Sequence, residues 1–165
     1  MQGKEGFIVK LKLTREYMSE GYDQARRYGS KWFLVERTVG FGFILLGLGL
    51  YLYANGETVL PVASIAIGVF EIFSNQIKKF FWLRRHSKSK LMNADVELDV
   101  TDVGIHTKGP FSKGHLEWSG IERAVRTPKG ILVWPQKGMY WYFPESVAGE
   151  ETIRFIQTKV ASSAN

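Results

Sequence analysis

The sequence predicts an α+β membrane protein in which two apolar helices interrupt a domain of short strands. Two long apolar runs, 38–54 and 58–77, stand in the first half of the chain with only Asn55-Gly56-Glu57 between them. A strongly basic segment, 78–90, follows the second run. From Asp95 onward the chain alternates apolar and polar residues with a period of two, which is typical of strands that are buried on one face.

The two apolar runs predict a transmembrane hairpin over 37–77. A helix needs about 20 apolar residues to cross a bilayer core of about 30 Å, and both runs come close to that length. The short polar break between them leaves room only for a tight turn. The alternative is a pair of buried helices in a soluble bundle, but such a helix normally keeps a polar face, and 38–54 has none.

Positive charge is concentrated beside the predicted hairpin. The chain carries 22 basic and 16 acidic residues, which gives a net charge of +6. We name residues 78–90 the basic collar, because they contain no acid and carry Lys78, Lys79, Arg84, Arg85, Lys88 and Lys90. Basic residues flank the hairpin on both sides and its turn carries only Glu57, so both ends of the chain are expected in the cytoplasm.

Anionic lipid headgroups are the expected partner of the basic collar. The alternative is that the collar only fixes the orientation of the hairpin. Nucleic acid is not expected, because no basic recognition helix, zinc pattern or RNA-binding aromatic motif accompanies the charge.

Glu71 is the ionisable residue inside an apolar run, and such a residue suggests a functional site by default. Counted outward from Gly56, Arg37 on the other arm lies about one helical turn from the level of Glu71. We therefore expect an intramembrane ion pair between Arg37 and Glu71. The alternative is that Glu71 lines an ion path in an oligomeric pore or transporter.

The sequence gives no sign of catalytic chemistry. The chain has no cysteine, which excludes disulfides, thiol catalysis and cysteine-ligated zinc. His86, His106 and His115 lack the HExxH type of spacing, and His106 and His115 approach each other only if their strands pair. No Ser/His/Asp order, paired carboxylates or phosphate-binding loop is evident. We therefore expect no enzyme and no cofactor, and we assign no catalytic, cofactor-binding or metal-binding residue.

Outside the hairpin, the pattern predicts seven strands and two helices. Residues 6–13 alternate as a strand, and Thr14 can cap a helix that reaches Trp32. After the collar, strands separated by Gly and Pro turns are expected at 95–100, 105–108, 115–118, 121–127, 131–135 and 139–144. A final helix is expected at 150–160. Seven strands and a closing helix are the layout of a pleckstrin-homology-like (PH-like) barrel.

Packing can also be predicted from the residue pattern. Alternation within the strands places four large apolar residues in the barrel core, namely Trp118, Ile121, Trp134 and Tyr142. Small residues let membrane helices approach closely, and they recur in both spans as Gly40 with Gly47, Gly42 with Gly49, and Ser64 with Gly68.

Several motifs resemble the YcxB-like family of bacterial membrane proteins. They are the opening Val9-Lys10-Leu11-Lys12-Leu13-Thr14-Arg15-Glu16-Tyr17, the paired apolar runs, Leu116-Glu117-Trp118-Ser119-Gly120-Ile121, and Tyr142-Phe143-Pro144. The resemblance covers almost the whole chain. It implies an N-terminal strand and helix, a membrane hairpin and a PH-like domain at the bacterial inner membrane. It supplies no catalytic residues.

The expected organisation is an N-terminal strand and amphipathic helix (1–36), the hairpin (37–77), the basic collar (78–90) and a cytoplasmic PH-like domain (91–165). The predicted function is a membrane-anchored binding or assembly module for a protein segment or anionic lipid headgroups, and the oligomeric state stays open. In an up-and-down meander, the turns at 110–114 and 128–130 return to the end where the collar enters. We therefore expect Phe111, Lys113 and Lys129 to face the lipid.

Overall fold

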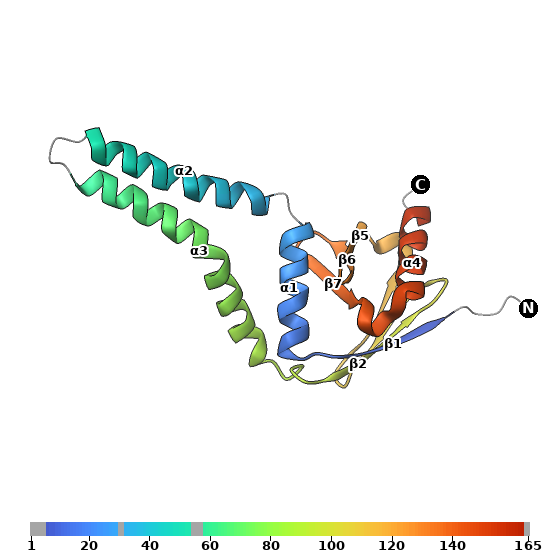
Figure 1. Cartoon of the computed structure of the whole chain (residues 1–165). Helices are drawn as coiled ribbons and strands as arrows, with labels where there is room; N and C mark the ends of the chain where they lie inside the picture. The colour runs from blue at the N-terminus through green and yellow to red at the C-terminus, as the bar shows by residue number, and fades with distance from the viewer. Residues whose placement is uncertain (1–5, 30–31, 54–57, 164–165) are drawn as a thin grey trace, which may run out of the picture. The chain divides into compact units, whose positions relative to one another are not determined.

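The computed structural model describes residues 6–29, 32–53 and 58–163. The chain divides into two compact units (Figure 1). The first, the α+β unit, contains 1–29 and 86–165, and the second, the hairpin unit, contains 30–85. The turn predicted at 55–57 lies outside the described residues.

The α+β unit contains all the strands among the described residues. Its elements are β1 (Phe7–Lys12), α1 (Arg15–Gly29), β2 (Asp95–Val100), β3 (Gly104–Lys108), β4 (Lys113–Glu117), a 3-10 turn η1 (Trp118–Gly120), β5 (Arg123–Thr127), β6 (Gly130–Gln136), β7 (Met139–Pro144) and α4 (Glu145–Ser163). The hairpin unit is built from α2 (Trp32–Tyr53) and α3 (Val59–Ser87), whose last residues lie just past the unit boundary.

The strands form two antiparallel sheets, with the orders β1-β2-β3-β4 and β5-β6-β7. In the four-stranded sheet, Phe7 lies opposite Val100 and Lys12 lies opposite Asp95. The strand before the hairpin unit thus pairs with the first strand after it. The hairpin is therefore an insertion into this sheet, as the sequence predicted.

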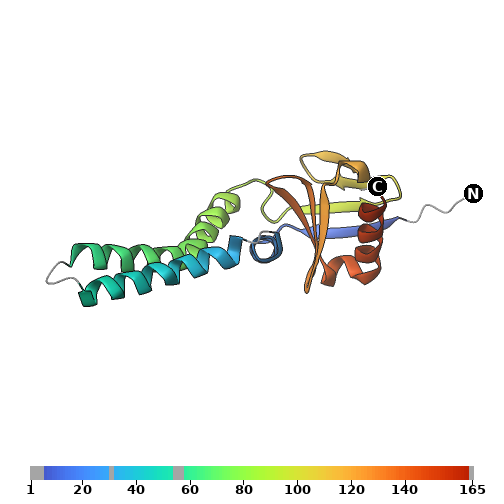
Figure 2. The same cartoon turned by 90° about the horizontal axis from the view of Figure 1, so that it is seen from above.

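The main core of the α+β unit lies between the two sheets and α4, which contacts β1 and β5 to β7 (Figure 2). Alternation in β1 and β2 turns Val9 and Leu98 inward and leaves Lys10 exposed. The fully buried side chains of this core include Val100, Ile105, Ile131, Val133, Phe143, Ile153 and Ile156. Both sheets and the last helix therefore share one apolar interior.

β6 is buried on both faces, which explains its continuous apolar sequence. Ile131 and Val133 join the main core, whereas Leu132 and Trp134 point to the opposite face. There they form a second cluster with Tyr142, against which Tyr17, Ala25 and Tyr28 of α1 pack.

The burial predicted for four large side chains is confirmed, since Trp118, Ile121, Trp134 and Tyr142 are all buried. Only the first two belong to the main core. Trp134 and Tyr142 lie in the second cluster, because α1 covers the outer face of the three-stranded sheet.

Helix α1 begins as predicted, because the hydroxyl of Thr14 accepts a hydrogen bond of 3.1 Å from the backbone N–H of Tyr17. Its described residues reach Gly29, and the extension predicted over 30–31 lies outside the described residues. At that end Arg123 donates a 2.8 Å hydrogen bond to the Gly29 carbonyl, and its guanidinium lies 4.2 Å from the centroid of the Trp134 ring. A Cβ atom at Gly29 would come within 2.8 Å of the Trp134 ring, so close packing favours glycine here.

Helix α4 begins at Glu145, five residues before the predicted start at 150. Gly149 interrupts it with a positive φ of 76°, which a glycine adopts easily. The sequence pattern revealed only the longer segment after this break.

The two helices of the hairpin unit are long and apolar enough to cross a membrane. Only 11% of the most apolar part of α2 and 17% of that of α3 is buried. This exposure argues against core helices of a soluble bundle, which bury most of their apolar surface. Figure 1 shows α2 and the first half of α3 side by side and a bend near the middle of α3.

Glycines on one face of α2 allow the two helices to approach closely. Added Cβ atoms at Gly40 and Gly47 would come within 3 Å of atoms of Ile72 and Ile65, respectively. Gly42 and Gly49 meet nothing within 4 Å. Of the two predicted glycine pairs, only Gly40 with Gly47 therefore packs within the hairpin.

Candidate lipid-facing surface

The basic collar is helical over most of its length, because α3 continues ten residues beyond the predicted end at Ile77 and stops at Ser87. Lys and Arg favour helices intrinsically, so the transition from apolar to basic sequence does not end the helix. The side chains of Phe80 and Phe81 are exposed among the basic residues, with ring centroids 5.6 Å apart. Lys78 Nζ lies 3.9 Å from Glu36 Oε1, which offsets part of its charge.

The last two basic residues of the collar, Lys88 and Lys90, lie in the turn that joins α3 to β2 and are exposed. This turn is fixed to the end of β1 by two backbone hydrogen bonds. The N–H of Asn93 donates to the carbonyl of Leu13 at 3.1 Å, and the N–H of Leu13 donates to the carbonyl of Ala94 at 3.0 Å.

The turn between β3 and β4 lies at the same end of the four-stranded sheet. Lys108 pairs with Glu97, which is close to the start of β2, and Lys113 lies opposite Lys108. The turn itself is closed by a 2.9 Å hydrogen bond from the Gly109 N–H to the Ser112 carbonyl. Phe111 at its tip is 66% exposed. The strand register therefore brings Phe111 and Lys113 to the sheet end that also carries Lys88 and Lys90.

Lys129 lies in the β5–β6 turn of the three-stranded sheet. Its Nζ is 3.4 Å from Glu20 Oε2 of α1. The Glu20 carboxylate also accepts a 2.5 Å hydrogen bond from the Tyr142 hydroxyl. Burial and this acidic partner raise the pKa of Tyr142 above its usual value. Lys129 is thus paired with an acid of α1, and its place on a lipid-facing surface stays a prediction.

The polar residues of the hairpin unit include Glu71, whose carbonyl accepts a 2.8 Å hydrogen bond from the Ser74 hydroxyl. Gly40 packs next to Ile72, and Arg37 is three residues, about 4.5 Å along the axis, from Gly40. Arg37 therefore lies about one helical turn from the level of Glu71. A direct ion pair between their side chains stays a prediction.

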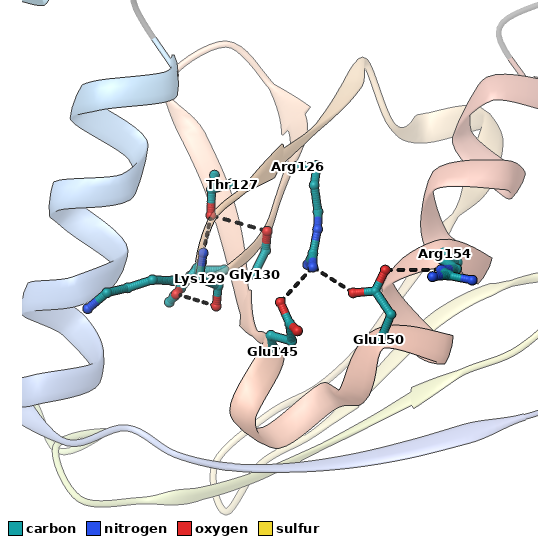
Figure 3. Close-up of polar contacts among 8 residues, drawn as sticks. Arg126, Thr127, Lys129, Gly130, Glu145, Glu150 and Arg154 are labelled. Atoms are coloured by element: carbon teal, nitrogen blue, oxygen red, sulfur yellow. Dashed lines mark hydrogen bonds and ion pairs between the residues drawn. The ribbon is translucent and has the colours of Figure 1, made fainter.

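A network that the sequence pattern did not reveal joins β5 to α4 (Figure 3). Arg126 Nη2 lies 2.6 Å from both Glu145 Oε2 and Glu150 Oε2. Glu150 also accepts a 3.0 Å hydrogen bond from Arg154 Nε. The two carboxylates stand on either side of Gly149, so Arg126 fixes the two segments of α4 at the break. The only signal in the sequence is a pair of acids around a glycine, which is too common to predict this contact.

The β5–β6 turn beside this network is itself tightly bonded (Figure 3). The hydroxyl of Thr127 donates to the carbonyl of Gly130 at 3.1 Å, and the carbonyl of Lys129 accepts from the N–H of Glu145 at 2.9 Å. A Cβ atom at Gly130 of β6 would overlap the carbonyl oxygen of Phe143 in β7, so the close contact between these two strands requires glycine at this position.

These contacts have the character of structural anchors. In the Arg126 network two guanidinium groups face two carboxylates, so the charges within it balance. The part of the chain that the structure describes contains no group of three His, Asp or Glu side chains able to hold a metal ion. No protein-family model matches this chain, and no curated protein matches it either.

Proposed function

We propose that this chain is a membrane-anchored, PH-like binding or assembly module of the bacterial inner membrane, with a protein segment or anionic lipid headgroups as its ligand. The observation that carries the proposal is the continuity of α3. Its apolar first part can cross a membrane, and the same helix continues into the basic collar with exposed Phe80 and Phe81. Basic side chains beside exposed aromatic rings suit the interface of an anionic bilayer.

The PH-like assignment is supported by the arrangement of elements in the α+β unit. Seven antiparallel strands in sheets of four and three, with a C-terminal helix over the shared core, fit a PH-like barrel. The motifs that resemble the YcxB-like family lie in β1 and α1, around η1, and at the end of β7. Membership of that family is part of the proposal.

The lipid-facing residues in this proposal are those of the basic collar together with Phe111 and Lys113, and Lys129 is a weaker member. Each basic side chain near an anionic surface contributes about 1 kcal/mol. The ion pair between Lys78 and Glu36 reduces the contribution of Lys78. Exposed Phe111 would add apolar contact at the headgroup boundary.

The membrane topology can be tested in cells, because the chain has no native cysteine. With both termini cytoplasmic, Asn55→Cys reacts with an impermeant thiol reagent in intact cells, and Ser162→Cys reacts only after lysis. The opposite labelling pattern would refute the proposed orientation.

The lipid surface can be tested on the full chain in nanodiscs. An environment-sensitive fluorophore attached at Ser112→Cys should shift to shorter wavelength in anionic nanodiscs relative to zwitterionic ones. Adding Lys113→Glu should reduce the shift, and Lys137→Glu, in the β6–β7 turn, serves as the matched control. Equal emission in both lipids, or equal effects of the two substitutions, would leave a protein segment as the ligand.

A pore or transporter subunit that uses Glu71 is the second candidate. The observation in its favour is that Asn75 Oδ1, one turn beyond Glu71, is buried without a hydrogen-bond partner among the described residues. Ion flux in proteoliposomes that disappears with Glu71→Gln would favour this candidate. An enzyme is the least favoured class.

A further inference from the structure

The outer face of the four-stranded sheet brings two histidines together. His106 of β3 lies directly opposite His115 of β4, and Asp99 of β2 lies opposite His106 on its other side. Alternation along β3 buries Ile105 completely and leaves His106 exposed, and His115 is exposed as well. Both imidazoles are therefore held on a rigid sheet and open to solvent.

The two imidazole rings are in direct contact. Their centroids are 4.1 Å apart with an interplanar angle of 24°, and their Nδ1 atoms are 3.0 Å apart. At this separation one Nδ1 donates a hydrogen bond and the other accepts it. When both rings are neutral, one ring therefore carries its proton on Nδ1 and the other carries its proton on Nε2. Two positively charged imidazolium rings would repel each other in this position.

We propose that His106 and His115 form a two-histidine site for a divalent transition-metal ion of the Ni(II) or Cu(II) type. Metal–imidazole bonds are about 2.0–2.1 Å long, so nitrogens 3.0 Å apart subtend about 94° at a shared ion. This angle is close to the right angle of square-planar or octahedral coordination.

Binding requires only local changes. The proton between the rings moves to the Nε2 atom of the donor ring by exchange with water, so both Nδ1 atoms can bind without a net loss of protons. The rings also have to turn about χ2 toward the ion, and their exposure allows this without moving the core. The carboxylate of Asp99 points to the Gly6 side, since its Oδ1 would lie 3.5 Å from a Cβ at Gly6. Water therefore fills the remaining coordination positions.

A bound ion would link the two strands that carry the exposed loop tip. Beyond the histidines, Thr107 lies opposite Gly114 and Lys108 lies opposite Lys113, and the turn with Phe111 follows. The metal would thus restrain the β3–β4 hairpin close to Phe111. This site does not depend on the function proposed above.

The test uses the tag-free full chain in detergent, titrated with Ni(II) in a calorimeter at pH 7.5. We expect one Ni(II) site that weakens at least about tenfold in His106→Ala and in His115→Ala, because each loses the chelating partner. His86→Ala is the control and should bind like the wild type.

Three results would overturn the proposal. The first is no Ni(II) binding to the wild-type chain, and the second is wild-type affinity in either His106→Ala or His115→Ala. The third is an equal loss of affinity in His86→Ala. Circular dichroism of each variant separates loss of the site from loss of the fold, and His115→Gln provides a second exposed substitution if His115→Ala does not fold.

Discussion

Replacing Trp118 by alanine should destabilise the α+β unit more than any surface substitution. The side chain is only 6% exposed and lies in the main core, where it packs edge-on against Phe155 with ring centroids 6.2 Å apart. Its Nε1 donates a 3.0 Å hydrogen bond to the Thr101 carbonyl. Removing a buried Trp side chain and leaving a cavity costs about 3–5 kcal/mol of unfolding free energy.

The hydrogen bond can be separated from the packing by a second substitution. Trp118→Phe keeps most of the apolar volume but leaves the Thr101 carbonyl without its donor, which should cost about 1–2 kcal/mol. Thr101 is only half-buried, so water can reach its carbonyl and limit the loss. Trp118→Ala should therefore be clearly more harmful than Trp118→Phe.

The assay for both variants is urea unfolding of the full chain in mild detergent, followed by far-UV circular dichroism. Phe111→Ala is the control, because that ring is 66% exposed and its loss should change the unfolding free energy by less than about 0.5 kcal/mol. The reasoning would be refuted if Trp118→Ala unfolded within about 1 kcal/mol of the wild type, or if it were no worse than Trp118→Phe.

Three further predictions concern the hairpin and the pH dependence of stability. Gly47→Leu should disrupt the hairpin and lower its thermal stability in detergent, whereas Gly42→Leu should be nearly neutral, because only a side chain at Gly47 would meet α3; equal effects would contradict the observed packing. In a double-mutant cycle, Arg37→Gln combined with Glu71→Gln should be less harmful than the sum of the single changes, and strict additivity would rule out the pair. Because the pKa of the Tyr142 hydroxyl is raised in the folded state, the unfolded state loses the hydroxyl proton first as the pH rises. The free energy of unfolding should therefore fall above a pH of about 10. Tyr142→Phe should make this fall with pH less steep, and an unchanged pH dependence would contradict the assignment to Tyr142.

The sequence was most informative where structure depends on neighbouring residues. The alternation in 95–100 and 139–144 predicted β2 and β7 at their observed bounds. The two apolar runs predicted α2 and α3, and the Thr14 cap predicted the start of α1. The basic collar, Phe111 and Lys113 could also be named from the sequence, because charge and turn residues are visible without a fold.

The sequence was less informative where two distant segments decide the result. The carbonyl of Gly29 accepts a hydrogen bond from Arg123, and a Cβ atom at Gly29 would meet the ring of Trp134, both about a hundred residues later in the chain. The same dependence applies to Lys129, whose ion pair with Glu20 of α1 joins residues more than a hundred positions apart. Partners of this kind depend on tertiary contacts that no local pattern contains.

By itself, the sequence determined that the chain has a membrane-length helical hairpin, a basic segment beside it and a strand-rich second half, because hydropathy and periodicity are local properties. Only the tertiary structure decided that β1 and β2 pair across the insertion, that β6 is buried on both faces, and that Arg126 holds α4 on either side of Gly149. It also decided that His106 and His115 stand 3.0 Å apart. These features arise from strand register and helix packing, in which residues far apart in the chain are brought into contact by the burial of a shared core.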